Sequence, residues 1–240
     1  KYDPDIVICA YFVGNDFSDN CARLDTNPRI YMDIDKNGHL YVKPFSVTRK
    51  NLSIWLNQHS RFYVWQKYKV NVAIKTVARS EKIYRVRGGR LIFMNKDSDK
   101  LKYAWNLNEK IIHAFHEEVV NDKRIFLFVV VPSSVQLYDD NWEEFFAKDK
   151  GAQKYLDIDY PDQKLFEIVN KKDIDSIFLR DGLEKYINNR PRTDPKAQVL
   201  YQEGRGHLNE VGNLLSAEMI YTHLVNNGAI SQLIENHSKL

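Results

Sequence analysis

Cysteine and long apolar runs are both scarce in this sequence of 240 residues. Two cysteines, Cys9 and Cys21, cannot form the disulfide framework of a small secreted scaffold, and Cys9, inside an apolar run, is expected to be a small buried side chain. No stretch approaches the roughly 20 apolar residues of a membrane-spanning helix. The opening residues 1–4 do not read as a signal peptide. The sequence therefore excludes a disulfide scaffold and predicts no helix that spans a membrane.

The composition is that of an ordered globular chain. Hydrophobic residues make up 43% of the sequence and aromatic residues 12%, which excludes a disordered chain. A chain of this length can bury a sizeable core within one domain. The net charge of +3 by itself points to no class of partner. We therefore expect a single domain over residues 1–240.

Strand and helix patterns alternate along the chain. Three apolar runs are typical of strands buried in a parallel sheet: residues 6–13, 123–131 and 174–179. Three segments have apolar residues at helical spacing: 105–120, 165–170 and 208–225. In the first of these, the apolar residues recur at intervals of four: Leu107, Ile111, Phe115 and Val119. This alternation predicts an α/β fold in which helices flank a doubly wound parallel sheet.

The segment from about residue 27 to residue 100 interrupts this alternation and is expected to be an insertion. Residues 30–43 alternate around Asn37-Gly38, which predicts a β-hairpin. The same residues spell Asp33-x-Asp35-x-Asn37-Gly38, the opening of a calcium loop, but Pro44 stands at the twelfth position, where that loop needs a bidentate acid. We therefore favour the hairpin. Helical spacing over residues 52–78 predicts one or two further helices.

Positive charge is concentrated between Arg61 and Arg90, where nine Lys or Arg accompany the single acid Glu81. Aromatic residues interleave with these charges: Tyr63, Trp65 and Tyr68. Such a stretch suits an anionic membrane surface, an acidic glycan or nucleic acid. A solvated face of an inserted helix is the more common origin of a charge run and is favoured here. We expect no nucleic-acid partner, and membrane contact through residues 61–90 stays open.

Gly14-Asn15-Asp16 directly follows the first apolar strand. In an open parallel sheet such a corner lies at the carboxyl ends of the strands, where ligands bind. Asn15 could simply close the turn. Its side-chain amide could instead donate to the oxyanion of an acyl-transfer reaction, a donor worth on the order of 3 kcal/mol. Gly14 is expected to let the backbone approach closely there.

His207 stands in a glycine-flanked turn just before the last helical segment. A lone His at a helix entry commonly has no chemical role. Here, however, Gly206 precedes it and Asn209 and Gly212 follow it, so the imidazole would be a base held on a rigid turn. Asn209 is expected to cap the helix that follows.

The strand ending in Gly14-Asn15-Asp16 and the run from His207 to Gly212 resemble the third and fifth sequence blocks of the SGNH (GDSL-type) hydrolases. The resemblance covers most of the chain, in the family's order. It implies a flavodoxin-like sheet, with Asn15 as an oxyanion-hole donor and His207 as the general base. The family's Gly-Asp-Ser block, which carries the nucleophile, occurs nowhere in the sequence. We therefore expect a C-terminal portion of a longer enzyme, whose serine-bearing strand pairs with residues 6–13.

The acid of the catalytic triad departs from the family's pattern. The family places an Asp two or three residues before the His, where this sequence has Arg205 and Gly204. Glu203 is the nearest acid and is a candidate to orient His207, and a dyad oriented by a backbone carbonyl is the alternative. Arg205 is expected to contact an anionic group of the substrate or to pair with Glu203.

The resemblance implies a serine esterase or deacylase for ester-linked acyl groups, with O-acyl groups of a polysaccharide favoured as substrate. It implies no metal and no organic cofactor. His113 and His116 are expected on the solvated face of the helix at 105–120 rather than on a metal. Two alternatives remain: a non-catalytic relative that binds glycans or a protein in the same crevice, which Arg205 favours, and an O-acyltransferase with the same residues.

Overall fold

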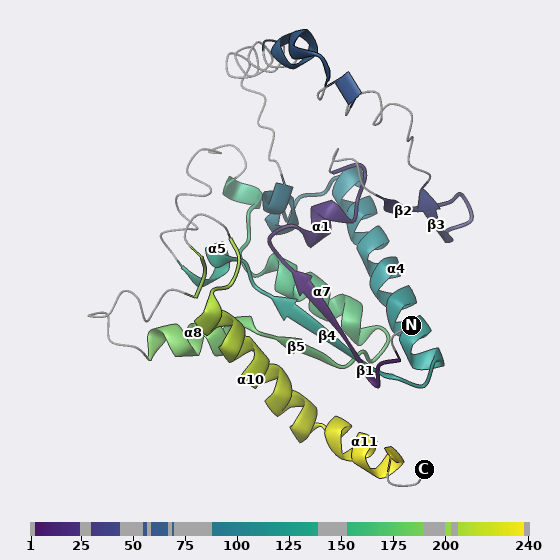
Figure 1. Ribbon diagram of the computed structural model, residues 1–240, viewed down its shortest axis with the longest axis vertical. Helices are drawn as coiled ribbons and strands as arrows, with labels where there is room; N and C mark the ends of the chain where they lie inside the picture. Colours follow the sequence, from purple (N-terminus) through teal and green to yellow (C-terminus); the bar gives the residue numbers. More distant parts are fainter. Residues whose placement is uncertain are drawn as a thin grey trace.

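The computed structural model describes residues 3–24, 30–43, 55–56, 59–66, 69, 88–138, 153–189, 200–202 and 206–237 (Figure 1). These residues form a mixed α/β fold with a three-stranded parallel sheet in the order β1-β4-β5. The strands are β1 (Ile6–Phe12), β4 (Ile125–Val131) and β5 (Ser176–Phe178). The predicted parallel sheet flanked by helices is therefore confirmed at this level.

The central strand β4 is buried on both faces. Its partner β1 pairs along its whole length, from Ile6 opposite Ile125 to Phe12 opposite Val131. The predicted strand at 123–131 starts two residues too early, because Lys123 has a φ of 61° and lies in the turn before β4. An apolar run this uniform is what a strand covered by helices on both sides requires.

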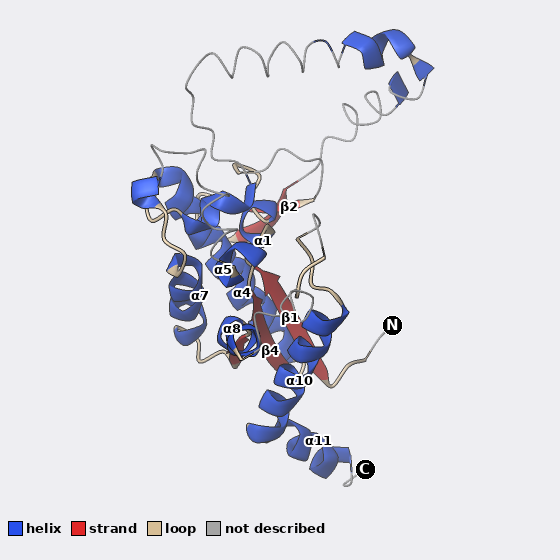
Figure 2. Ribbon diagram, turned by 90° about the vertical axis from the view of Figure 1, so that its left-hand side faces the viewer, coloured by secondary structure: helices blue, strands red, loops and turns tan. Residues whose placement is uncertain are grey.

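Helices cover the two faces of the sheet with separate cores (Figures 1 and 2). One face carries α4 (Asp99–Asn121) and α7 (Tyr160–Asn170), which pack against the even-numbered residues of β4. The other carries α8 (Arg180–Asn188), α10 (Glu210–Asn226) and α11 (Ala229–His237), which pack around Leu127 and Val129. This arrangement buries both faces of the central strand β4.

Helix α4 corrects the predicted apolar stripe. The helix begins at Asp99, six residues before the predicted start at residue 105. Leu107 and Val119 are buried, but the Phe115 side chain is 39% exposed. Phe115 lies beside the start of the edge strand β1, where it lines a groove with Pro4 and Val7. The buried face includes other positions: Leu101, Ala104, Trp105, Asn108 and Ile112.

The later elements differ from the prediction mainly at their ends. Helix α7 begins five residues before the predicted residue 165, and β5 is shorter than the predicted 174–179. Helix α10 begins at Glu210 rather than residue 208, because Asn209 is its N-cap. Helices α8 and α11 were not predicted from the sequence.

Between β1 and α4 lies the predicted hairpin, formed by β2 (Tyr31–Ile34) and β3 (Leu40–Lys43). The Asp35 carboxylate accepts the N–H groups of Asn37 and His39, both at 2.8 Å, and Gly38 has a φ of 86°. Asp35, which the calcium-loop pattern would make a metal ligand, therefore closes the hairpin turn. The hairpin prediction is confirmed.

Part of the predicted helical segment 52–78 lies outside the described residues. The described residues that are helical in this segment are 55–56, 59, 61–66 and 69. The 3-10 helix η1 (Gly88–Phe93) follows and leads toward α4. In the part of the chain that the structure describes, no helix has the length and apolar character needed to cross a membrane.

Candidate functional site

The chain turns sharply where β1 ends. The N–H of Asn15 donates to the carbonyl of Phe12 at 3.4 Å, which closes the turn. Asn15 is also the N-cap residue of the short helix α1 (Asp16–Asp19), and its carbonyl accepts the N–H groups of Ser18 and Asp19 at 3.0 and 2.9 Å. These bonds fix the corner, and the Asn15 side chain is exposed at the carboxyl end of β1.

The Asn15 side chain donates one of its two amide N–H groups within the turn. Its Nδ2 donates to Asp19 Oδ2 at 2.7 Å. An amide nitrogen carries two donors, and the second one has no partner among the described residues. The geometry thus leaves one N–H for an acceptor outside the chain, which is what an oxyanion-hole donor needs.

Gly89 of η1 approaches the same corner closely, and the sequence reasoning missed it. A Cβ on Gly89 would lie 1.8 Å from the carbonyl oxygen of Gly14, so no larger residue fits without moving the backbone. A Cβ on Gly14 would instead meet the ring of Phe12 at 2.3 Å, and that side chain is able to turn away. The backbone does approach closely at Gly14, as predicted, but the close contact is between the Gly14 carbonyl and Gly89. The residue that must be glycine for this contact is therefore Gly89.

The Asp16 carboxylate bonds to the last residue of β1, on the side of the strand away from β4. Its Oδ2 accepts the N–H of Phe12 at 2.7 Å. Burial raises the pKa of this carboxyl, the bond from Phe12 lowers it, and the charge of Asp19 raises it again. Burial, together with the Asp16 charge, raises the pKa of the nearby Cys9 thiol to about 11. Cys9 is half-buried against the core, and the raised pKa disfavours the thiolate that a nucleophilic cysteine needs.

Beneath the corner, a fully buried Asn108 on α4 joins three elements. Its Oδ1 accepts the Tyr11 hydroxyl at 3.1 Å and the Asn20 amide at 2.9 Å. Its Nδ2 donates to the carbonyls of Phe17 at 3.3 Å and Ala104 at 2.9 Å. All of its hydrogen-bonding capacity is used, which holds α1 against β1 and α4. The sequence signal was available: a polar residue next to Leu107 on the buried side of the helix.

His207 lies in a tight reversal that precedes α10. Tyr201 and Leu208 form an antiparallel bridge, and the N–H of Gln202 donates to the His207 carbonyl at 2.7 Å. Gly206 has a φ of 67°, the left-handed conformation that glycine adopts without strain. The imidazole is exposed at the surface of this reversal.

The reversal is fixed to the carboxyl edge of the sheet. The Tyr201 hydroxyl donates to the carbonyl of Pro132, which directly follows β4, and the Leu200 N–H donates to the Tyr138 hydroxyl at 2.9 Å. A Cβ on Gly212 would lie 2.5 Å from the Leu200 carbonyl oxygen, so the first turn of α10 fits against the reversal only with glycine there.

Asn209 caps α10 as predicted, because its Oδ1 accepts the Gly212 N–H at 2.9 Å. The cap places the start of the helix directly after His207. The ring of His207 then lies 6.4 Å from the ring of Phe12, centroid to centroid. Phe12 ends β1 and is three residues from Asn15, so the structure brings Asn15 and His207 to the same end of the same strand.

Glu203 and Arg205 lie outside the described residues, and so does Gly204. Among the residues that are described, no carboxylate is hydrogen-bonded to His207. The orienting acid of the imidazole is therefore not placed by the structure.

Two serines near this edge, Ser18 and Ser133, have buried side chains. Ser18 is buried, and its hydroxyl donates to the Asn15 carbonyl at 2.9 Å. Ser133, which follows β4, is also buried, and its Oγ has no partner within the described residues. Neither hydroxyl is presented to the surface where His207 is exposed.

His113 and His116 are half-buried, so the prediction of a wet face is wrong for both. The Nε2–H of His113 donates to the Ile168 carbonyl of α7 at 2.8 Å. The His116 ring packs edge-on against Phe126 at 5.4 Å, and burial lowers its pKa. Over the described ranges no three His, Cys, Asp or Glu side chains gather in a way that could hold a metal ion.

Comparison of the chain with protein-family models, with curated proteins and with solved structures finds no match.

Proposed function

We propose that this chain supplies the oxyanion-hole Asn and the general-base His of an SGNH-type serine esterase. In the proposed reaction a serine hydroxyl attacks the ester carbonyl while His207 takes its proton, and Asn15 Nδ2 donates to the oxyanion of the tetrahedral intermediate. His207 then returns the proton to the leaving alcohol. Water hydrolyses the acyl-enzyme, again with His207 as base.

The observation that carries the proposal is the position of Asn15 and His207 at the same end of β1, where the His207 ring lies near the Phe12 ring. The two residues are 192 positions apart in the sequence and come from independent turns. Each turn is fixed by its own hydrogen bonds, and each leaves its functional group exposed with donor or acceptor capacity to spare. The carboxyl end of a parallel sheet is where α/β proteins bind ligands.

The open edge of β1 supports the proposal from another direction. Within the described residues β1 has a neighbour on one side only. The odd-numbered residues near its end face β4, as shown by the Val13 N–H, which donates to the Val131 carbonyl at 3.0 Å. Backbone groups alternate in a parallel ladder, so those of Ile6, Ile8 and Ala10 point to the open side. In the proposed enzyme the serine-bearing strand pairs there.

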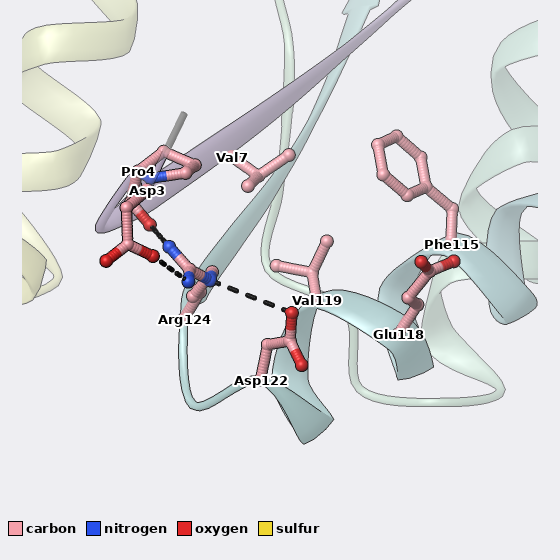
Figure 3. A pocket seen from close by; sticks show the side chains of 8 residues that line it. All are labelled: Asp3, Pro4, Val7, Phe115, Glu118, Val119, Asp122 and Arg124. Carbon is pink, nitrogen blue, oxygen red and sulfur yellow. Dashed lines mark hydrogen bonds and ion pairs between the residues drawn. The ribbon is translucent and has the colours of Figure 1, made fainter. Parts of the chain in front are cut away.

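A groove runs beside this edge (Figure 3). It has a volume of about 520 Å³ and lies between the start of β1 and the C-terminal half of α4. Pro4 and Val7 line one side, and Phe115 and Val119 line the other. Charged residues complete its lining: Asp3, Glu118, Asp122 and Arg124. Apolar side chains of an added strand would cover Phe115, whose exposure is otherwise unexplained.

The proposed substrates are O-acyl groups of a carbohydrate. The support is the long segment between Asn15 and His207, which in relatives of this type accompanies polysaccharide substrates. Small acyl esters are the next choice.

The test assays the chain together with the proposed serine-bearing strand, with a chromogenic acetyl ester and with an acetylated polysaccharide. His207→Ala should remove nearly all turnover, and Asn15→Ala should lower kcat by about 100- to 1000-fold. His39→Ala, at an exposed His in the hairpin, is the matched control and should leave turnover unchanged. Full activity in the His207 variant would overturn the mechanism.

A non-catalytic glycan-binding relative is the second candidate. It is favoured by the lack of any described carboxylate bonded to His207 and by Arg205 in the place of the family's acid. It predicts saturable binding of the polysaccharide by calorimetry, with no release of acyl groups, in the same protein.

A further inference from the structure

Two helical pieces meet at Ser60 and lie apart from the sheet and its flanking helices (Figures 1 and 2). The first ends with a helical bond from the Ser60 N–H to the Leu56 carbonyl at 2.9 Å. Ser60 begins the second, because its Oγ accepts the Tyr63 N–H at 3.1 Å and its carbonyl accepts the Val64 N–H at 3.1 Å. A hydroxyl cap of this kind fixes the break between the two pieces.

Large aromatic side chains of both pieces face solvent. Trp55 is 55% exposed, Phe62 67% and Trp65 54%. We call these three residues the aromatic surface. Aromatic side chains of this size are normally among the most buried groups of a protein, so three exposed ones in eleven residues mark an interaction site.

The second piece brings two aromatic rings and a lysine together. Phe62, Trp65 and Lys69 are at positions i, i+3 and i+7, so they share one side. The rings of Phe62 and Trp65 stack at 6.1 Å, and Lys69 Nζ lies 5.7 Å from the centre of the Trp65 ring. In the first piece the ring of His59 stacks on Trp55 at 5.2 Å. The side of the second helix that presents Phe62 and Trp65 therefore also presents the Lys69 ammonium group.

The charged residues near this segment in the sequence have one sign. From residue 36 to residue 80 the sequence has nine Lys or Arg and no Asp or Glu. Arg61 and Lys69 belong to the helical residues themselves and are both exposed. Exposed aromatic rings beside positively charged side chains complement a surface whose outer layer is anionic and whose inner layer is apolar.

We propose that the aromatic surface docks on an anionic lipid membrane. Trp and Phe enter the boundary between headgroups and acyl chains, where Trp rings are preferred, and Arg61 and Lys69 contact lipid phosphates. Each Lys or Arg near an anionic leaflet adds to the attraction, and the contribution falls with added salt. The docking is peripheral and holds the catalytic edge of the proposed esterase beside the membrane, without being part of its chemistry.

A lipid surface fits better than nucleic acid or a folded protein. Phe62 and Trp65 stack on each other and do not stand apart as platforms for separate bases. The aromatic surface is on the outside of the two helical pieces, where all three side chains are more than half exposed. A soft planar interface accepts such a convex surface, whereas a rigid partner needs a matching groove.

The experiment measures co-sedimentation of the protein with vesicles of phosphatidylcholine, with and without phosphatidylglycerol, over a range of salt concentrations. Binding should require phosphatidylglycerol and weaken with salt, and the emission of the exposed tryptophans should shift to the blue. The double variant Phe62→Ser/Trp65→Ser should lose about tenfold or more in vesicle affinity, since two buried rings are removed. Tyr221→Ser, at an exposed aromatic residue of α10, is the matched control and should bind as the parent does.

Three outcomes would overturn the proposal. They are equal vesicle binding by the double variant, preference for a soluble anionic polysaccharide or oligonucleotide over vesicles, and a dimer in light scattering that the double variant abolishes while vesicles bind neither protein. The substituted side chains are exposed, so circular dichroism and the urea midpoint should be unchanged and a folding defect is recognised separately. Esterase turnover in solution reports on the proposed reaction independently, so the two proposals fail by different measurements.

Discussion

The ring of His207 lies 6.4 Å from the ring of Phe12, at an angle of 33°. Phe12 is the last residue of β1, so this contact ties the reversal before α10 to the strand that also presents Asn15. The backbone around each residue is held by bonds to other elements, including Pro132 after β4. Substitutions in those supports should therefore affect the site from a distance.

Asn108→Leu should lower the free energy of unfolding by about 2 to 4 kcal/mol, because the Tyr11 hydroxyl and the Asn20 amide lose a buried acceptor. Urea unfolding measures the change. Asn106→Leu changes an exposed Asn on the same helix and should alter stability little. Equal effects of the two substitutions would show that the buried network does not hold α1.

Gly89→Ala should destabilise the chain by about 2 kcal/mol or more, since its Cβ cannot coexist with the Gly14 carbonyl oxygen at 1.8 Å. Gly38→Ala is the control: it meets no atom within 4 Å and costs only the strain of its φ of 86°, about 1 kcal/mol. Thermal unfolding of both variants makes the comparison. A smaller effect at residue 89 than at residue 38 would contradict the close approach.

Asp33 should make stability depend on pH in the acid range. Burial raises the pKa of its carboxyl, but hydrogen bonds from Tyr103, Lys43 and the Ile34 N–H outweigh burial and lower the pKa to about 2. A depressed pKa in the folded state adds stability above the unfolded value of about 4, and that stability is lost as the pH falls toward 2.

The Asp33→Asn variant should therefore be less stable than the parent at pH 7, by on the order of 1 kcal/mol, and the difference should vanish near pH 2. Urea unfolding at several pH values measures it. Asp97→Asn, at an exposed acid paired with Lys102, should show almost no difference at any pH. A pH-independent effect of Asp33→Asn would point to a packing defect instead.

Glu203→Gln separates a triad from a dyad when the chain is assayed together with the proposed serine-bearing strand. If Glu203 orients the imidazole, kcat for an acetyl ester should fall nearly as far as in His207→Ala, since an unoriented His loses most of its effect as a base. If a backbone carbonyl orients it, the loss should be far smaller. Full activity would remove Glu203 from the mechanism.

Residues 1–240 expressed alone should self-associate through the open edge of β1 and show no ester turnover, because unpaired strand edges pair with other chains. Ile8→Lys places a charge on that edge, where the Ile8 side chain is 46% exposed, and should reduce the association. Light scattering after size exclusion measures it. Phe166→Lys, at an exposed Phe of α7, should leave the association unchanged. A monomeric parent with ester turnover would mean that a serine of this chain is the nucleophile.

Local patterns predicted much of the framework. The apolar runs of β1 and β4 predicted parallel strands, and the two strands do pair in parallel. Burial on both faces is confirmed for β4 but is wrong for β1, where Ile8 and Ala10 are exposed. Asn37-Gly38 predicted the hairpin through the backbone conformation that it allows. The N-cap at Asn209 followed from the same kind of local rule. Helix ends were less accurate, as at α4, because burial against neighbours extends a helix past its periodic apolar residues.

Part of the candidate site also followed from local sequence patterns, and part of it did not. The sequence by itself determined that Asn15 follows an apolar strand and that His207 precedes a helix, because strand and helix signals are local. Only the tertiary structure decided that Asn108 anchors the corner, that Gly89 meets Gly14, and that His113 bonds to α7. Those relationships join residues distant in the sequence, and the close packing that fixes them leaves no periodic trace in either segment.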